Sequence, residues 1–250
     1  MQVDAGTVFT TLPEESYDFL ILVGVMEHIR DLDRAVGQFH KILKEGGRVY
    51  LEVPDASRLE PSLDAPFQEL SVEHINFLSP QSLSNLMQAR GFRTLATGRE
   101  RRAQNETICL SAYGVFEKSA TTVTQEKDTE TEIGLRGYIL GCQAEDARIR
   151  SEISKALPPG ERMIVWGVGT HTLRLLATGG LDPNKISLFV DSNSKYQQQE
   201  LRGIPVVSPS QLRSNTEPIL ISSRGFQREI LHQIRHSMAL TNPVILLYES

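Results

Sequence analysis

The sequence predicts an α/β fold made of two units, and three observations carry this prediction. Nearly continuous apolar runs, such as residues 17–26, suit strands that are buried on both faces of a parallel sheet. Segments with apolar residues at helical spacing alternate with these runs. A polar stretch rich in Thr and Glu, residues 119–132, separates one alternation from the next. We therefore expect a first domain at 1–118, a linker and connecting helix at 119–158, and a second domain at 159–250.

The first unit opens with a strand–helix–strand pattern. The apolar run at 17–26 leads into a helix that Asp31 can cap and that Gly46 and Gly47 end. The segment GRVYLEVPD, residues 47–55, predicts the next strand. These three elements form a βαβ unit, in which the two strands are parallel.

A short helix and two more strands complete the first unit. Ser79 followed by Pro80 is a favourable N-cap and first-turn pair, so a helix is expected to begin there. Residues 92–100 and 106–116 then read as an antiparallel pair of strands.

The second unit repeats the alternation. After a helix expected from Ile133 to Leu157, the segment 162–169 is a strand that runs into a glycine turn. A helix follows at 170–180, and the next strand, 185–193, carries Asp191 at its end. The remaining predicted elements are a strand and capped helix start at 203–212, a strand at 217–223, a helix at 226–235 and a last strand at 242–249.

Composition and charge exclude several classes of protein. The chain has 250 residues, is 40% hydrophobic and carries a net charge of −5, so nothing indicates a polyanionic partner such as nucleic acid. No apolar run reaches the roughly 18 residues of a membrane span, which makes a cytoplasmic protein the default. The two cysteines, Cys109 and Cys142, form no CxxC pattern, and we expect no metal site.

Two Glu-His pairs are the candidates for chemistry in the first unit. Glu27–His28 lies at the carboxyl end of a predicted strand, where open α/β sheets bind ligands. Glu73–His74 precedes the Ser79 helix start, and a histidine there could act as a base at neutral pH. Adjacent residues of an extended segment point to opposite faces, so Glu73 and His74 share a site only if the backbone turns. The alternative is that both histidines are structural.

The glycine turn of the second unit is a partial phosphate-binding pattern. Gly167 and Gly169 match the first two glycines of GxGxxG, but Thr172 stands at the third. Asp191 lies in the region expected for a ribose-binding acid, and phosphate could rest on the helix N-terminus at Thr170 and His171. The alternative is a tight turn with a structural role only.

The ordered set of segments resembles a known family. Residues 17–55, which include VMEHIRD and the turn KEGG, resemble the second half of a class I S-adenosylmethionine-dependent methyltransferase. Residues 66–92, with EHINFLSP, are similar to the sugar C-methyltransferases, and residues 165–212 look like their extra Rossmann-like domain. The resemblance implies a partial methyltransferase sheet followed by a second Rossmann-like α/β domain.

The resemblance also implies roles for individual residues. S-adenosylmethionine would be the cofactor and a nucleotide-linked keto-sugar the substrate, with His74 as base and Glu73 as its partner or as a ligand of a substrate hydroxyl. The implied cofactor-binding residues are Val25, Met26, Glu27 and His28. The implied substrate-binding residues are Ser71, Asn76, Gly167, Gly169, Thr170, His171 and Asp191.

Three departures separate the chain from this family. The glycine-rich turn after the family's first strand and the acid after its second are missing, as is the cysteine-rich zinc module, and Ser71 stands where the family often has Tyr. Without the earlier strands of that sheet, the apolar strand at 17–26 would present an open hydrophobic edge. We expect a rearranged N-terminal segment, a second copy, or a chain supplying the missing half to cover it.

Two other functions remain open at this stage. The chain could be a non-catalytic module, derived from a methyltransferase, that binds a nucleotide or a partner. It could also be an NAD-dependent oxidoreductase built on the second unit, although Thr172 and the lack of an evident hydride-transfer set count against this reading.

Overall fold

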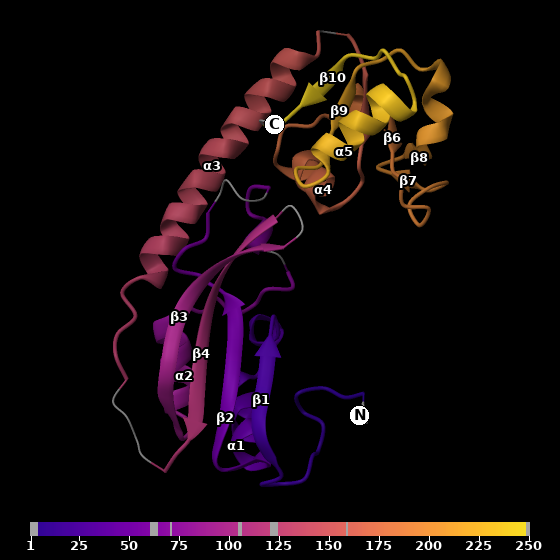
Figure 1. The fold of residues 1–250 in the computed structure, drawn as a ribbon. Coiled ribbons are helices and arrows are strands. Elements are labelled where there is room, and N and C mark those ends of the chain that lie inside the picture. Colours follow the sequence, from indigo (N-terminus) through magenta and orange to yellow (C-terminus); the bar gives the residue numbers. More distant parts are fainter. Residues whose placement is uncertain are drawn as a thin grey trace. The chain divides into compact units, whose positions relative to one another are not determined.

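A computed structural model describes residues 5–60, 65–70, 72–104, 107–120, 125–158 and 160–248. The chain divides into two compact units (Figure 1). Unit 1 comprises Met1–Glu60 and Glu69–Ile139, and unit 2 comprises Pro61–Gln68 and Leu140–Ser250. Both contain β-sheet and helices, which confirms the predicted α/β class. Among the helices described, none combines the length and the apolar character that a bilayer crossing requires.

Unit 1 contains a four-stranded mixed sheet in the order β1-β2-β4-β3. Strands β1 and β2 are parallel, whereas β2–β4 and β3–β4 are antiparallel. Both the predicted βαβ unit and the predicted antiparallel pair are thereby confirmed. The strands are β1 (Tyr17–Val23), β2 (Leu43–Pro54), β3 (Phe92–Gln104) and β4 (Thr107–Lys118).

Helices α1 (Leu32–Ile42) and α2 (Pro80–Gln88) pack on the same face of this sheet (Figure 1). Their apolar side chains join those of β2 and β4 in one core, which includes Phe39, Leu83 and Phe116. The predicted helix starts are confirmed, because the Asp31 side chain accepts from the Arg34 amide and Ser79 caps α2.

The end of α1 differs from the prediction. The helix stops at Ile42 instead of at Gly46 and Gly47, because Leu43 adopts extended angles (φ −76°, ψ 139°). Leu43 pairs with Tyr17 and is fully buried, so burial of this side chain in the sheet outweighs one more turn of helix. Strand β2 consequently begins four residues earlier than its predicted start at Gly47.

Strand β1 is not buried on both faces as predicted. It stands at the end of the sheet order, and Phe19, Ile21 and Val23 are 46%, 67% and 54% exposed. Their neighbours in register include Tyr50 and Glu52 of β2, so they belong to the sheet face opposite the helices. The expectation that a further segment or chain covers this strand stays a prediction.

Unit 2 contains a six-stranded sheet in the order β10-β9-β5-β6-β8-β7, and every pair is parallel except β7–β8. Strand β5 is central, as in doubly wound nucleotide-binding folds. The Rossmann-like prediction for this unit is therefore confirmed. The strands are β5 (Met163–Trp166), β6 (Ile186–Val190), β7 (Glu200–Leu201), β8 (Ile204–Val207), β9 (Ile219–Ile221) and β10 (Val244–Leu246).

Helices flank this second sheet and enclose two separate apolar clusters. The long helix α3 (Thr131–Ala156) contributes residues to both units, so the division of the chain falls inside it, at Ile139–Leu140. The other helices of unit 2 are α4 (Thr170–Ala177), α5 (Gln227–His232), a π-helix η5 (Gln233–Ser237), and the 3-10 helices η3 (Pro183–Lys185) and η4 (Pro209–Ser214).

Candidate functional site

The two Glu-His pairs lie against each other beyond the carboxyl end of β1. The first pair lies in a 3-10 helix, η1 (Met26–His28), and the second follows another, η2 (Gln68–Leu70). The backbone amides of Ile75 and Asn76 donate to the carbonyl of Glu27 at 2.9 and 3.1 Å. Segments 46 residues apart in the chain are therefore joined at the place where α/β sheets bind ligands.

The side chain of Asn76 stabilises this junction by two hydrogen bonds. Its side-chain nitrogen donates to the carbonyls of Met26 at 3.0 Å and Ile29 at 2.7 Å. Both N–H donors of the amide are therefore used inside the protein. Asn76 thus positions the two histidine-bearing segments relative to each other, and its role in substrate binding stays a prediction. Ser71, the other residue predicted on the substrate side of this unit, lies outside the described residues.

The rings of His28 and His74 are neighbours, with centroids 5.0 Å apart and planes tilted by 58°. Nδ1 of His28 donates to the backbone carbonyl of Glu73 at 2.8 Å, which leaves Nε2 with a free lone pair. That nitrogen lies 3.8 Å from Oε1 of Glu27. The backbone does turn at Glu73, as a shared site requires.

The carboxylate near His74 is not the predicted one. Oε2 of Glu69, in η2, lies 3.8 Å from Nδ1 of His74, whereas Glu73 is exposed and contributes its carbonyl to His28. Glu73 as the partner of His74 is therefore corrected to Glu69. No spacing in the sequence pointed to Glu69, because its approach depends on the turn between η2 and His74.

Glu27 is the unusual side chain of this cluster. It is only 4% exposed, and its Oε2 atom has no hydrogen-bond partner among the described residues. A buried carboxylate oxygen without a partner is costly, and such atoms mark places where a ligand or ion supplies the missing contact. Gly24 precedes it with φ +66°, a left-handed conformation that turns the chain out of β1.

The other two predicted cofactor residues, Val25 and Met26, differ in their burial. Met26 is fully buried in the core of unit 1, so its side chain cannot line a cofactor site, which corrects that prediction. Val25 is partly buried and packs against the same core. Among the described residues at this end of the sheet, the side chains of Val25, Glu27, His28 and His74 are placed where they can meet a ligand.

The glycine turn of unit 2 is held in place by close packing and by hydrogen bonds. A Cβ on Gly167, where φ is +110°, would lie 2.9 Å from the carbonyl oxygen of Ser222, so glycine is required there. Asp191 accepts from the amides of Val168 at 3.0 Å and Asn193 at 2.8 Å. Both carboxylate oxygens of Asp191 therefore accept hydrogen bonds from backbone amides. Gly169 is the N-cap of α4, and Thr170 is the first residue of that helix.

His171 points into the protein, which makes the prediction of a phosphate contact wrong. Its Nδ1 lies 3.0 Å from Oγ of Ser222 and its Nε2 lies 2.5 Å from the hydroxyl of Tyr248. Desolvation by burial, helped by the positive charge of Arg174, lowers the pKa of His171 to about 4. The imidazole is therefore neutral at pH 7 and works as an interior hydrogen-bonding group.

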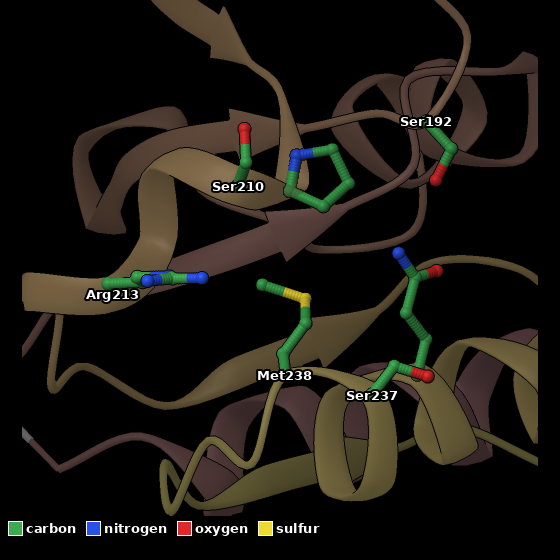
Figure 2. Close-up of a pocket in the computed structure, with 7 residues that line it drawn as sticks. Ser192, Ser210, Arg213, Ser237 and Met238 are labelled. Carbon is green, nitrogen blue, oxygen red and sulfur yellow. The ribbon is translucent and has the colours of Figure 1, made fainter.

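A pocket in unit 2 escaped the sequence reasoning. It has a volume of about 440 Å³ and lies between the loop after β6, helix η4, and helix η5 with the Met238 that follows it (Figure 2). Figure 2 shows Arg213 and Met238 reaching toward its middle. It is lined by Ser192, Pro209, Ser210, Arg213, Gln233, Ser237 and Met238. Short polar side chains of this kind carry no recognisable spacing in a sequence.

Comparison with known proteins assigns a family resemblance to the part of the chain that holds the Glu-His pairs. Residues 2–97 match the family model of a methyltransferase domain. This match supports methyl transfer as the chemistry of that part and implies S-adenosylmethionine as its cofactor. No curated protein matches the chain.

Several solved structures share part of the fold. A SAM-dependent methyltransferase of Thermotoga maritima, described as a possible histamine N-methyltransferase, is 23% identical with a TM-score of 0.38, and the match covers 46% of this chain and 62% of that one. The [4+2]-cyclase SpnF is 12% identical with a TM-score of 0.35, covering 47% and 55%. A SAM-dependent methyltransferase of Archaeoglobus fulgidus is 14% identical with a TM-score of 0.36, covering 46% and 66%. The chain thus spans less than two thirds of each of these proteins.

The described residues fit one wall of such a cofactor site. The turn from Gly24 to His28 leaves the carboxyl end of a parallel strand, and Oε2 of Glu27 has no donor within the part of the chain that the structure describes. When bound, the cofactor supplies an activated methyl group. Val25, Glu27 and His28 are the residues of this chain that would lie beside it.

Proposed function

We propose that this chain takes part in S-adenosylmethionine-dependent methyl transfer to a small molecule, with His74 at the acceptor side. One observation carries the proposal: His74 is brought next to the η1 turn at the end of β1, inside the segment that matches a methyltransferase domain. The finer form of the proposal is carbon methylation of a nucleotide-linked keto-sugar.

His74 is the base in this proposal. Methylation at carbon requires removal of a proton next to a carbonyl, and an imidazole titrates in the range where it can accept one. The carboxylate of Glu69, 3.8 Å from Nδ1, would stabilise the imidazolium that forms. The hydrogen bond from His28 to the Glu73 carbonyl holds the backbone beside His74, so the base and the turn under the cofactor keep their relative placement.

We expect His74→Ala to lower kcat with a keto-sugar nucleotide by about 100- to 10,000-fold, the range that a general base contributes, while cofactor affinity changes little. Calorimetric titration of the full chain with S-adenosylmethionine and S-adenosylhomocysteine measures the affinity, and a methyl-transfer assay measures kcat. His232→Ala is the matched control, because this exposed histidine lies in unit 2. Failure of the folded chain to bind either cofactor would contradict the proposal.

A non-catalytic module that binds a nucleotide or a partner is the second candidate, and the pocket beside Ser192 and Arg213 is the observation that favours it. In that case nucleotides would bind the chain, and Arg213→Ala would weaken them while His74→Ala would not. An NAD-dependent oxidoreductase has less support, because Thr172 is fully buried where a dinucleotide site needs its third glycine.

The proposal also includes the location of the protein and the kinds of partner it has. A cytoplasmic location, a small-molecule substrate, and no nucleic acid or membrane partner are consistent with the net charge of −5. A second copy, or a chain that supplies the rest of a methyltransferase sheet, would cover the exposed side chains of β1.

A further inference from the structure

We infer that Glu27, His28 and His74 bind a divalent transition-metal ion, with zinc as the probe. Each of these residues offers one ligand atom, and the three atoms all lie within 4.8 Å of one another. The sequence analysis did not predict a metal site here, because the members of this group come from segments that are joined only by the fold. The inference goes beyond methyl transfer and requires no bound cofactor.

The ligand set is chemically suited to such an ion. Two imidazole nitrogens and one glutamate oxygen are a ligand combination of open zinc sites, and the same combination also serves non-haem ferrous sites. Hard ions such as Ca²⁺ prefer oxygen ligands throughout, so two histidines select against them. Three protein ligands leave a further coordination position for water or a ligand.

The orphaned oxygen of Glu27 is an independent reason to expect a cation. The Glu27 side chain is 5% exposed, and its Oε2 has no hydrogen-bond partner among the described residues. Burial of an ionised carboxylate oxygen is strongly unfavourable unless a charge or a donor compensates it. A metal ion between Glu27, His28 and His74 would compensate the charge of this buried carboxylate.

The hydrogen bond of His28 prepares its ring for coordination. Histidines that bind metals almost always donate their second ring nitrogen to a carbonyl or a carboxylate, which fixes the tautomer. Nδ1 of His28 makes such a bond with the carbonyl of Glu73 at 2.8 Å, and the freed Nε2 faces Glu27. The carboxylate of Glu69 lies 3.8 Å from Nδ1 of His74 and adds negative charge beside the cluster.

Only a small closure is needed to form the site. Ligand atoms around a tetrahedral zinc ion at about 2.0–2.1 Å stand about 3.3 Å from one another. The Nε2 atom of His28 and Oε1 of Glu27 are 3.8 Å apart. The side chains of His28 and His74 are 41% and 24% exposed, so both rings have room to rotate toward the buried carboxylate.

Metal binding and base catalysis would compete for His74. A bound ion occupies the ring lone pair that a base needs, so the two states of this histidine exclude each other. The inference is tested without a methyl donor or an acceptor. Its failure and the failure of the proposed methyl transfer are therefore separate results.

The experiment is a calorimetric titration of the chelator-treated full chain with ZnCl₂, repeated with CoCl₂ while visible absorption is recorded. We expect one ion per chain, with Co²⁺ bands of low-coordinate geometry. Glu27→Gln and His74→Ala should each weaken zinc binding by more than about 100-fold, since loss of an outer-shell partner alone costs about 10- to 100-fold. His28→Ala is the third variant, and circular dichroism checks that each variant is folded.

His232 and His236 provide the control, because their rings are 4.5 Å apart and form the other close histidine pair described in the structure. The double variant His232→Ala/His236→Ala should keep the single site and its Co²⁺ bands. Three outcomes would overturn the inference: no stoichiometric binding by the folded chain, unchanged affinity in Glu27→Gln and His74→Ala, or loss of the site in the His232 and His236 double variant.

Discussion

Acidification from pH 7 to pH 4 is expected to reduce the stability of unit 2 by about 3 kcal/mol through His171 alone. The pKa of this histidine is lowered to about 4 in the folded protein, chiefly because burial disfavours the charged ring. The unfolded chain has an ordinary pKa of about 6.5 and therefore binds a proton first as the pH falls. The stability that neutral His171 confers is thus complete above about pH 6.5 and is lost progressively between pH 6.5 and 4.

Urea unfolding followed by tryptophan fluorescence measures this effect. Trp166 is the single tryptophan of the chain and lies buried in β5, so its signal reports on unit 2. The variant His171→Gln keeps a polar side chain beside Ser222 and Tyr248 but cannot titrate, and its unfolding free energy should vary about 3 kcal/mol less across this range. His232→Gln is the exposed control. An equal pH slope in the wild type and in His171→Gln would refute the assignment.

The apolar and glycine patterns predicted the elements well, because each of these signals is local. The strand at 17–26, the helix capped by Asp31 and the helix begun by Ser79 and Pro80 all form where their residues indicated. The predictions were wrong where tertiary packing, and not the local sequence, decides the end of a helix or the burial of a strand. Leu43 leaves the helix to pair with Tyr17, and β1 exposes Phe19, Ile21 and Val23 because they lie on the sheet face opposite helices α1 and α2.

The site shows the same division between local and long-range information. Both Glu-His pairs stood out in the sequence, but their approach depends on the hydrogen bonds of Asn76 and of the Glu73 carbonyl. No periodic pattern in the sequence predicts these long-range contacts. Cysteine spacing indicates no metal site, whereas the group that could hold one consists of one glutamate and two histidines from separate segments and has no fixed spacing in the sequence. His171 and Met26 were assigned to ligands by their place in a motif, whereas the fold turns both side chains inward.

The segment that carries His74 is tied to the sheet by a buried ion pair, and the variant Arg99→Met should break it. Asp55, just after β2, is 1% exposed and accepts from Nε of Arg99 at 2.9 Å. The residue after Asp55 donates its amide to the carbonyl of Leu78 at 3.0 Å, and Asp55 itself forms a β-bridge with Leu78. Leu78 lies four residues after His74, so we expect the ion pair, through this bridge, to help hold the His74 segment in place.

We expect Arg99→Met to lower the unfolding free energy of unit 1 by about 3 kcal/mol, because it leaves the buried Asp55 carboxylate without an opposite charge and with only the hydrogen bonds from Ser57. The value is set at the low end of the usual range since the Arg99 side chain is 28% exposed. The double variant Arg99→Met/Asp55→Asn should recover part of the loss, because it removes the stranded charge. Urea unfolding followed by circular dichroism provides the measurement.

Arg101→Met is the matched control on the same strand. Its guanidinium is 57% exposed and lies 3.8 Å from Glu60, so its loss should change stability by less than about 1 kcal/mol. If Asp55 positions the His74 segment as well as stabilising it, Arg99→Met should also weaken zinc binding, while Arg101→Met should not. A stability loss in Arg99→Met with unchanged zinc affinity would show that Asn76 and the Glu73 carbonyl are sufficient to hold the two histidines together.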